Sequence, residues 1–315
     1  MALNAVRHLL KISDLTKSEI QLIIDLAKDI KANPNKYSDR LKQKTLLMLF
    51  EKPSLRTRVS FETGMTQLGG HAIFYSTTDS PLGQKESYSD TAKVLSRMVN
   101  IVMARVKSRD QVRQLAANST IPIINALDDY AHPCQMLADI LTISEKIHIP
   151  LEQLKLAYCG DLNNNVTYDL MRLGSVIGFT VHAAGPTLEG YAPEESVLTE
   201  CRELCKQSGG NVKIFSNVQE AVTDVDVVYV DSWMSYGIDK KDEEKRISIF
   251  KPFQVTEKVM SLAKPTAIFM NCLPAARGME QTAEVIDGPQ SIVFDQAENR
   301  LHAQKALLIF LLNAI

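Results

Sequence analysis

The sequence predicts an α/β protein of two domains, each a parallel β-sheet flanked by helices, with a C-terminal helix that returns to the first domain. Short apolar runs rich in β-branched residues alternate with amphipathic, helix-like segments from end to end, which is typical of βαβ units. The alternation starts afresh after Ile149 and Pro150. A chain of 315 residues is also too long for one ordinary core and suits two.

The apolar runs of strand length fall into two groups, and amphipathic segments of helical period separate them. In the first half of the chain they are residues 46–50, 72–75, 101–104 and 121–124. In the second half they are residues 154–159, 179–183, 212–215, 225–230 and 267–270. Because helical connections lead to parallel pairing, each half should form a parallel sheet.

The last part of the chain decides the expected domain boundaries. A helix-like segment, about 297–315, follows the apolar run 291–294 and should cross back to pack on the first domain. We therefore expect a first domain of residues 1–148 plus this helix, and a second domain of residues 149–296. The charged stretch 239–246 is expected to be a solvated loop, either a plain surface loop or a mobile lid.

Composition argues against several classes of protein. The chain is 45% hydrophobic and 23% charged with a formal net charge of -2, so no global positive field attracts nucleic acid or anionic lipid. We expect no secretory signal, because the N-terminus lacks a long apolar segment before a cleavage site. The apolar stretch 306–315 is too short for a bilayer and predicts a buried terminal helix.

Cysteine usage and glycine patterns leave no expected metal or cofactor. Five cysteines, an odd number, suggest a reducing compartment and hence the cytoplasm. Cys201 and Cys205 lie four apart, but no His or further Cys nearby completes a zinc site. Gly160 ends a strand-like run without the G-x-G-x-x-G pattern, and the P-loop pattern is also missing, so NAD and ATP are disfavoured.

The most specific local feature lies where the first apolar run meets the helix that follows it. Residues 51–58 read EKPSLRTR. A helix N-terminus offers unpaired N–H groups and the positive end of a dipole. Arg56 and Arg58 add permanently charged, forked donors, and Ser54 and Thr57 add hydroxyls. The combination predicts a phosphate site.

Polar residues also follow several of the other predicted strands. In open parallel sheets, ligands bind beyond the carboxyl ends of the strands, which makes these residues candidates. Taken singly, Arg105 or His132 would more often be structural. Their recurrence at one predicted edge of both sheets favours a site instead. The candidates are Arg105, His132, Gln135, Asp161, residues 163–165, Asp231, Ser235 and residues 271–274.

Motifs at these positions resemble the aspartate/ornithine carbamoyltransferase family, and the resemblance covers nearly the entire chain. The motifs are Ser54-x-Arg56-Thr57-Arg58, His132-Pro133-x-Gln135, Asp231-x-x-x-Ser235-x-Gly237, Cys272-Leu273-Pro274 and Ala297-Glu298-Asn299-Arg300. The first two are shared by the wider family and indicate the half that binds carbamoyl phosphate. The next two point to its ornithine-specific members.

The resemblance implies a cytoplasmic, cofactor-free enzyme of arginine metabolism that converts carbamoyl phosphate and L-ornithine to L-citrulline and phosphate. It implies a carbamoyl-phosphate-binding domain at 1–148 with the terminal helix, and an ornithine-binding domain at 149–296. It also implies a homotrimer in which the loop 80–87 reaches a neighbouring subunit's active site. Lys85 of that loop is then either a phosphate contact in trans or a plain surface lysine.

By the same resemblance, the candidate residues divide between the two substrates. The carbamoyl-phosphate site would comprise Ser54, Leu55, Arg56, Thr57, Arg105, His132, Gln135, Cys272, Leu273 and Arg300, with Lys85 in trans. The ornithine site would comprise Asn164, Asn165, Asp231, Ser235 and Tyr236. The catalytic residues among them would be Asp231, Cys272, Arg105 and His132.

These residue types suit the chemistry. Attack of an uncharged amine on the carbamoyl carbon puts negative charge on the carbonyl oxygen and then on phosphate, so preorganised cations and N–H donors lower both barriers. The amine must first lose a proton, and Cys272 beside Asp231 is the expected pair for that step. A nucleophilic Cys272 and a purely structural Asp231 are the alternatives for these two residues.

Three positions depart from the pattern usual in ornithine-specific members. Tyr236 stands where Met is usual, Asn271 replaces the His before Cys-Leu-Pro, and Pro81 stands where many members carry Gln. A bulkier wall at Tyr236 keeps open a sister enzyme that acts on putrescine or N-acylated ornithine. A catalytically inactive, anion-binding or regulatory homologue is the alternative of another class, but the charge-stabilising residues are all present, which favours the enzyme.

Overall fold

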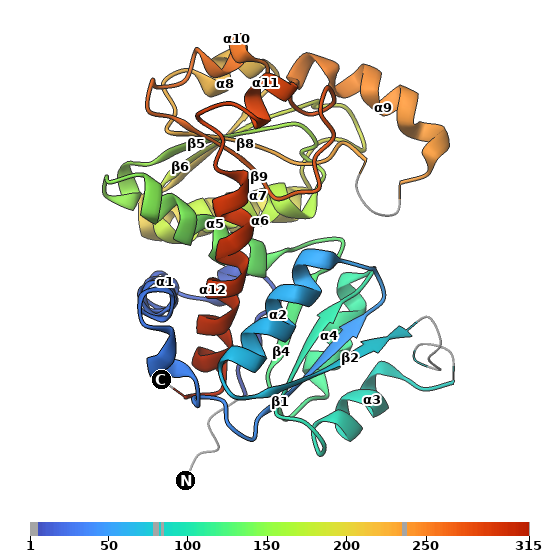
Figure 1. Ribbon diagram of the computed structural model, residues 1–315. Coiled ribbons are helices and arrows are strands. Elements are labelled where there is room, and N and C mark those ends of the chain that lie inside the picture. Colours follow the sequence, from blue (N-terminus) through green and yellow to red (C-terminus); the bar gives the residue numbers. More distant parts are fainter. Residues whose placement is uncertain (1–5, 78–81, 83–84, 235–237, 315) are drawn as a thin grey trace. The chain divides into compact units, whose positions relative to one another are not determined.

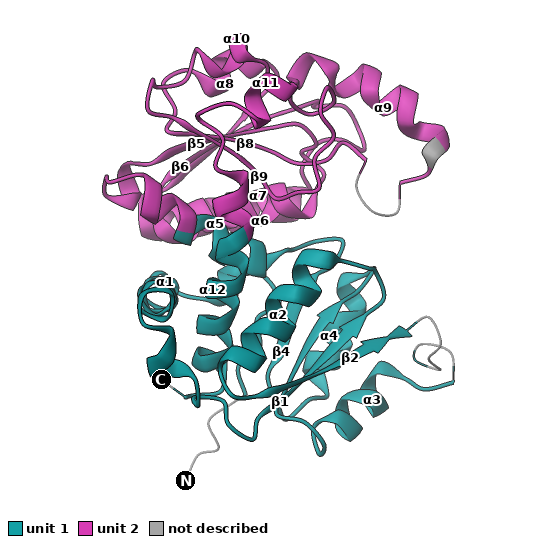
Figure 2. Ribbon diagram, in the orientation of Figure 1, with its two compact units in different colours: residues 1–141, 298–315 teal, residues 142–297 magenta. Residues whose placement is uncertain are grey.

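The chain folds into two compact units (Figure 2). The computed structural model describes all residues except 1–5, 78–81, 83–84, 235–237 and 315. The first unit comprises residues 1–141 and 298–315, and the second comprises residues 142–297. The chain therefore leaves the first unit within one helix and re-enters it within its last helix.

The first unit contains a four-stranded parallel sheet in the order β2-β1-β3-β4 (Figure 1). The strands are β1 (Thr45–Phe50), β2 (His71–Ser76), β3 (Ile101–Arg105) and β4 (Ile123–Leu127). The helices are α1 (Lys17–Ala32), α2 (Leu55–Gln67), α3 (Tyr88–Leu95), α4 (Arg109–Ala117) and α5 (Pro133–Lys146), which runs on into the second unit. The central strand β3 is buried along its whole length, as expected for a parallel sheet covered by helices.

The second unit contains a five-stranded parallel sheet in the order β7-β6-β5-β8-β9. The strands are β5 (Lys155–Cys159), β6 (Thr180–Ala184), β7 (Asn211–Phe215), β8 (Val227–Val230) and β9 (Ile268–Asn271). The helices are α6 (Asn165–Ile177), α7 (Glu195–Ser208), α8 (Val218–Val222), α9 (Glu243–Phe250), α10 (Glu257–Met260), α11 (Ala283–Ile286) and the start of α12 (Val293–Leu311). The predicted fold class, with two parallel sheets flanked by helices and a C-terminal helix, is confirmed.

Both sheets reverse their strand order at one place, and these two places position the candidate residues. In the first unit the reversal lies between β1 and β3, where Phe50 pairs with Arg105. In the second unit it lies between β5 and β8, where Cys159 pairs with Val230. Ligands of open α/β sheets bind beyond the strand ends at such switch points, because the flanking connections there turn to opposite faces.

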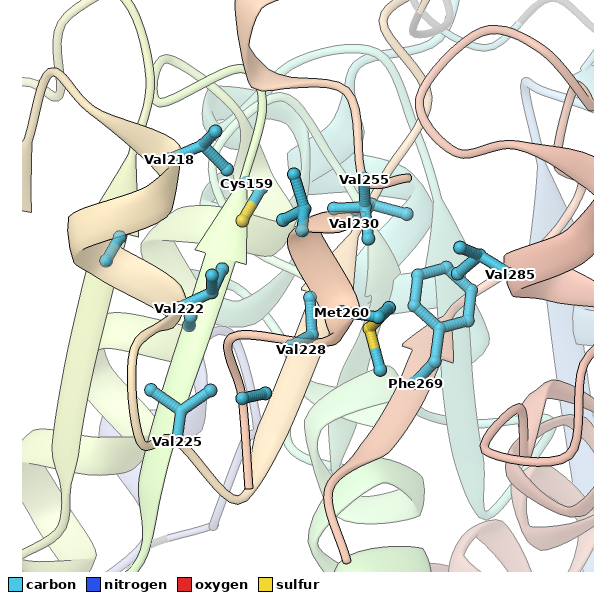
Figure 3. Packing of buried hydrophobic residues seen from close by; sticks show 14 of the residues in the cluster. Cys159, Val218, Val222, Val225, Val228, Val230, Val255, Met260, Phe269 and Val285 are labelled. Carbon is cyan, nitrogen blue, oxygen red and sulfur yellow. The ribbon is translucent and has the colours of Figure 1, made fainter. Parts of the chain in front are cut away.

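Buried side chains pack on the sheet of the second unit and fix the positions of its strand ends. Val228 and Val230 of β8 and Phe269 of β9 pack with Met260 of α10 and Val285 of α11 (Figure 3). All five side chains are buried. Full burial of a side chain of this kind stabilises a fold by about 1.5–3 kcal/mol relative to exposure.

Helix α12 contributes its C-terminal part to the first unit. Residues 306–309 of this helix are buried, and Lys305 Nζ donates to Gln67 Oε1 of α2 at 2.9 Å. Arg300 of the same helix contacts Gln135 near the start of α5. Within the described residues, no helix combines the length and the apolar character needed to cross a membrane.

The expectation of a loop at 239–246 is wrong, although most of the described side chains in this segment are exposed to solvent. The segment forms a 3-10 turn at Lys240–Asp242 and then the first half of α9. Arg246 forms an ion pair with Asp161, and its Nε donates to the carbonyl oxygen of Trp233 at 2.7 Å. These contacts hold the segment against the second unit, because a charged side chain inside the stretch finds buried partners that the local sequence does not reveal.

The expected terminal helix starts earlier than residue 297 and includes the end of the apolar run 291–294. Ser291 forms an isolated bridge with Phe269, and helix α12 already begins at Val293. The apolar side chains of a buried helix start and of a short strand look alike in sequence, and length alone does not separate them here. The helix therefore begins four residues earlier than the expected residue 297.

Candidate active site

The start of α2 is built as an open helix N-terminus. Ser54 caps the helix from an extended backbone, and its Oγ accepts from Thr57 N at 3.3 Å and donates to Thr57 Oγ1 at 3.0 Å. No acidic residue lies in the first turn. The positive end of the helix dipole is thus left for an external anion, with Leu55 exposed and Arg56 half-buried beside it.

A cluster of buried basic and polar side chains lies around this helix start. Arg300 Nη1 donates to Gln135 Oε1 at 2.7 Å, and Arg300 Nη2 lies 3.4 Å from Thr57 Oγ1. Burial, followed by the charges of Arg300, Arg105 and Arg56, lowers the pKa of His132 well below its usual value. The imidazole is therefore neutral at physiological pH, and it can donate one hydrogen bond without adding charge.

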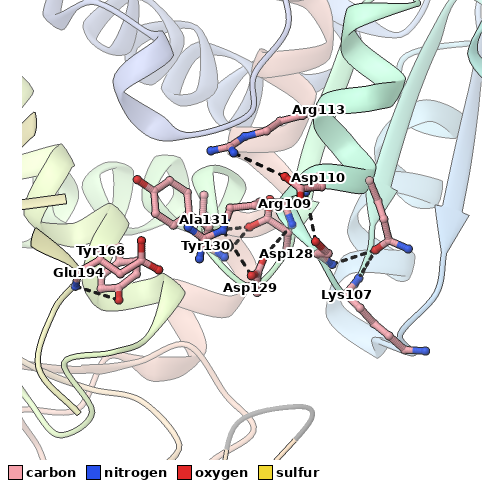
Figure 4. A network of polar contacts seen from close by, with 12 residues as sticks. Lys107, Arg109, Asp110, Arg113, Asp128, Asp129, Tyr130, Ala131, Tyr168 and Glu194 are labelled. Carbon is pink, nitrogen blue, oxygen red and sulfur yellow. Dashed lines mark hydrogen bonds and ion pairs between the residues drawn. The ribbon is translucent and has the colours of Figure 1, made fainter. Parts of the chain in front are cut away.

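Figure 4 shows the polar contacts of the loop after β4, which directly precedes His132 in the chain. Asp128 Oδ1 accepts from the backbone N–H groups of Tyr130 and Ala131, both at 2.7 Å, and this turn leads the chain into α5. Burial raises the pKa of Asp128 to about 6. Arg109 stacks on the Tyr130 ring with Cζ 3.9 Å from the centroid, so the loop is fixed from α4 as well.

Several buried residues of this cluster are absent from the sequence-based set. Asp139 accepts from Gln135 Nε2 at 2.8 Å and so fixes the amide of Gln135. Gln304, in the amide orientation that its neighbours satisfy, accepts from Arg300 Nη2 at 3.1 Å. Lys52 is 9% exposed, and burial and Arg105 lower its pKa. A polar residue one helical turn from Gln135 or Arg300 in an otherwise apolar segment is the signal that could have indicated the first two.

The switch point of the second unit carries a carboxylate and thiol pair. Cys272 Sγ donates to Asp231 Oδ1 at 3.0 Å, and Asn164 Nδ2 donates to Asp231 Oδ2 at 3.1 Å. Asp231 is buried, which raises its pKa, while the hydrogen bond from the Cys272 thiol acts in the opposite direction. Each carboxylate oxygen therefore has a defined donor before any substrate binds.

Further ionisable groups surround Asp231. Burial raises the pKa of Asp161 to about 6 despite its ion pair with Arg246. Glu280 is 1% exposed, and burial and the charge of Asp231 raise its pKa to about 7. Glu280 is missing from the residues predicted from the sequence, because no motif or strand end marks its position.

The remaining candidates lie at the margins of these two groups. Asn165 is the first residue of α6 and is half-buried next to the capping residue Asn164. Leu273 follows Cys272 with a left-handed backbone at φ +54°. Lys85 is exposed in the first unit. The candidates Ser235 and Tyr236, and the departures at Tyr236 and Pro81, lie outside the described residues.

Two models of known protein families match this chain, one in each half. The carbamoyl-P binding domain of the aspartate/ornithine carbamoyltransferases matches residues 7–145, and their Asp/Orn binding domain matches residues 152–311. These matches identify the class of protein as a carbamoyltransferase, and its two units carry the basic cluster and the carboxylate and thiol pair. The chain belongs to the aspartate/ornithine carbamoyltransferase family.

Individual relatives are similar over nearly the whole length. The anabolic ornithine carbamoyltransferase of Pyrococcus furiosus is 46% identical over 99% of this chain and 98% of its own. An ornithine carbamoyltransferase of Caldicellulosiruptor saccharolyticus is 46% identical over 97% of this chain and 98% of its own. Among solved structures, ornithine transcarbamoylase from Giardia lamblia matches with a TM-score of 0.90 at 47% identity, covering 98% of each chain.

Proposed function

We propose that this chain transfers the carbamoyl group of carbamoyl phosphate to the δ-amine of L-ornithine and releases L-citrulline and phosphate. The observation that carries the proposal is the presence of two chemically different groups at the two switch points. One is the basic cluster of Thr57, Arg105, His132 and Arg300, and the other is the Asp231 and Cys272 pair. Relatives named ornithine carbamoyltransferase that match 97–99% of the chain support it.

In the first unit, the proposed roles follow from charge and donor type. Arg56 and the N–H groups at the start of α2 bind the phosphate oxygens, with Ser54 and Leu55 contributing from the same turn. Thr57, Arg105 and neutral His132 donate to the carbamoyl carbonyl oxygen, where negative charge develops during attack. Gln135 binds the carbamoyl NH₂ group, and Arg300 completes the positive field around the departing phosphate.

In the second unit, the proposed roles concern the acceptor. Asp231 and Ser235 bind the α-amino group, Asn164 and Asn165 bind the α-carboxylate, and Tyr236 lies beside them. The backbone carbonyl groups of Cys272 and Leu273 accept from the carbamoyl NH₂ group. A planar carboxamide such as that of Asn165 suits a carboxylate because its two N–H bonds converge on the carboxylate oxygens.

The proposed reaction is a direct displacement without a covalent enzyme intermediate. The δ-ammonium of ornithine first loses a proton, which costs about 4–5 kcal/mol at neutral pH for an amine with the pKa of lysine. The amine nitrogen then bonds to the carbamoyl carbon, and the bond between that carbon and the bridging phosphate oxygen breaks. The nitrogen loses its second proton as phosphate departs, and the Asp231 and Cys272 pair assists the proton losses.

A comparison of amine substrates tests this function. Turnover with carbamoyl phosphate is measured for L-ornithine, putrescine and N-acetylornithine. We expect ornithine to exceed putrescine by about 100-fold in kcat/KM, because putrescine lacks the α-carboxylate and forgoes the proposed contacts with the two asparagines. A preference for either other amine would indicate a sister enzyme. Binding of carbamoyl phosphate in calorimetry without turnover of any amine would indicate an inactive anion-binding homologue.

We also propose the assembly and the setting that the family resemblance implies. The chain forms a cytoplasmic homotrimer with active sites at its subunit interfaces, and Lys85 contacts phosphate bound to a neighbouring subunit. Residues 1–148 with the terminal helix act as the carbamoyl-phosphate-binding domain, and residues 149–296 as the ornithine-binding domain. Light scattering on the purified protein at micromolar concentration checks the trimer, and a monomer mass would contradict it.

A further inference from the structure

A chain of buried carboxamides holds the loop that carries Cys272. Asn271 is the last residue of β9 and is 0% exposed. Its Oδ1 accepts from Leu273 N at 2.8 Å, and its Nδ2 donates to Gln281 Oε1 at 3.0 Å. Gln281 Nε2 then donates to the carbonyl oxygen of Ala276 at 3.2 Å. Each amide oxygen accepts and each amide nitrogen donates, so the chain has one direction and fixes both side chains.

The backbone of Asn271 is anchored separately. Asn271 N donates to Gln296 Oε1 at 3.0 Å, and Gln296 Nε2 donates to the hydroxyl of Tyr229 in β8 at 3.1 Å. The side chain of Asn271 is therefore presented from a fixed point at the end of the sheet. The loop it holds begins at the next residue.

The held loop includes a backbone conformation that needs support. Leu273 has φ +54°, a left-handed conformation that costs a residue with a side chain about 1–3 kcal/mol. The acceptor that Asn271 offers to Leu273 N closes a turn of the type that Asn side chains stabilise. Cys272 lies between the two bonded residues, so the direction of its side chain is fixed by the same turn.

We propose that Asn271, supported by Gln281, positions the segment Cys272–Leu273 so that the Cys272 thiol meets the Asp231 carboxylate. Asn271 is then a positioning residue of the transferase and touches none of the reacting atoms. The inference deepens the proposed function and rests on it for its kinetic consequences. Its structural content, the direction of the thiol, stands on the hydrogen bonds at 2.8 Å to Leu273, 3.0 Å to Gln281 and 3.0 Å from Cys272 to Asp231.

The first test is the kinetics of Asn271→Leu, which has a similar volume and neither acceptor nor donor. We expect kcat to fall about tenfold, because the thiol no longer has a fixed direction. The KM for ornithine should change less than about twofold, since Asp231 and the acceptor-binding asparagines stay in place. An unchanged kcat would overturn the proposal.

A double-mutant cycle shows whether Asn271 acts through the thiol. In a Cys272→Ala background, Asn271→Leu should cost less than about twofold in kcat, because the group that it positions is already gone. An equal tenfold cost in both backgrounds would mean that Asn271 acts through some other atom, and the proposal would fail. The milder variant Gln281→Met keeps the turn at Leu273 and should lower kcat by about threefold, which keeps the test usable if Asn271→Leu does not fold.

Alkylation of Cys272 gives a readout that does not depend on activity. A carboxylate that accepts from a thiol raises the thiol pKa and slows its reaction, so releasing the thiol from Asp231 should speed alkylation. With iodoacetamide and peptide mass spectrometry, we expect Cys272 to react about threefold faster in Asn271→Leu than in the parent protein. If the parent protein does not turn over ornithine, the proposed function fails while this rate still tests the positioning.

A control comes from an exposed Asn-capped turn of the same unit. Asn217 caps α8, and its Oδ1 accepts from Gln219 N at 2.8 Å and from Glu220 N at 3.3 Å. Asn217→Leu should lower the free energy of unfolding by about 1 kcal/mol. It should leave both kcat and the alkylation rate of Cys272 unchanged. A loss of kcat in this control equal to that of Asn271→Leu would show that general destabilisation causes both effects and would overturn the proposal.

Discussion

At the scale of single residues, burial decides the charge state of the groups in both switch-point regions. His132 is neutral because it is buried among Arg300, Arg105 and Arg56, which lower its pKa. Asp231 has a raised pKa because it is buried, although the thiol of Cys272 donates to it. A neutral imidazole donates a hydrogen bond without adding charge, and a carboxylate with a raised pKa is better able to accept a proton. Both properties suit a reaction in which the attacking amine must lose its proton.

Replacing Arg56 with Ala should raise the KM for carbamoyl phosphate by at least about 100-fold, because the change deletes a charge-assisted, forked donor to phosphate. The affinity for phosphate alone should fall in parallel, which isothermal titration measures directly. Arg58→Ala is the control from the same turn, since Arg58 is exposed and pairs with Glu62 at 3.2 Å. Equal effects of the two substitutions would remove Arg56 from the site.

Glu280 makes the stability of the second unit depend on pH. Its pKa in the folded state is about 7 against an ordinary value of 4.5, so the folded protein binds more protons between these values. The stability is fully present below pH 4.5 and is lost as the pH rises through 7. Glu280→Gln should therefore match the parent protein near pH 4 and exceed its unfolding free energy by about 3 kcal/mol at pH 8. Urea unfolding at both pH values checks this, and a pH-independent difference would contradict it.

At the scale of elements, the helix starts and the strand ends carry the chemistry. The open N-terminus of α2 follows β1, and the Asn164-capped N-terminus of α6 follows β5. Strands β1 and β5 each border a switch point. The helices that follow them therefore begin where ligands bind in open α/β sheets. Helix α9 has a different role, because its own residue Arg246 anchors it to Asp161 and Trp233.

The anchor of α9 predicts an effect on the acceptor. Arg246→Met removes the ion pair with Asp161 and the bond to the carbonyl oxygen of Trp233, two residues after Asp231. We expect the KM for ornithine to rise about tenfold, while the KM for carbamoyl phosphate stays within about twofold, because the change lies in the second unit alone. Arg202→Met, which removes only the exposed pair with Glu195, is the control. Equal changes in both KM values would show a general structural effect instead.

At the scale of the whole molecule, the proposed trimer predicts complementation between inactive variants. Lys85→Ala and Arg56→Ala are each expected to be impaired if Lys85 contacts phosphate bound to a neighbouring subunit. Unfolding and refolding a 1:1 mixture should then restore about a quarter of the parental activity, because random assortment pairs an intact Arg56 with an intact Lys85 in about one interface of four. Full activity of Lys85→Ala alone, or no recovery in the mixture, would contradict a contact in trans.

The sequence by itself determined the fold class and the types of residue at the strand ends. Alternating apolar runs and amphipathic segments report local periodicity, and periodicity is a property of neighbouring residues. The motifs at Ser54, His132 and Cys272 are equally local, which is why the family could be inferred from them. The errors at 239–246 and at the start of the last helix arose where short segments had no distinctive period.

Only the tertiary structure decided which side chains meet. Arg300 and Gln135 are 165 positions apart in the chain, and Asp231 and Cys272 are 41 apart, so local periodicity relates neither pair. The motifs and the chemistry led us to expect Cys272 beside Asp231, but which atoms form the hydrogen bond is decided by the fold. The carboxamide chain from Asn271 to Gln281 was likewise hidden, because an amide in a loop has many possible partners. Strand order and helix packing select among these partners, and the choice of partner fixes the pKa values and the directions of the reactive groups.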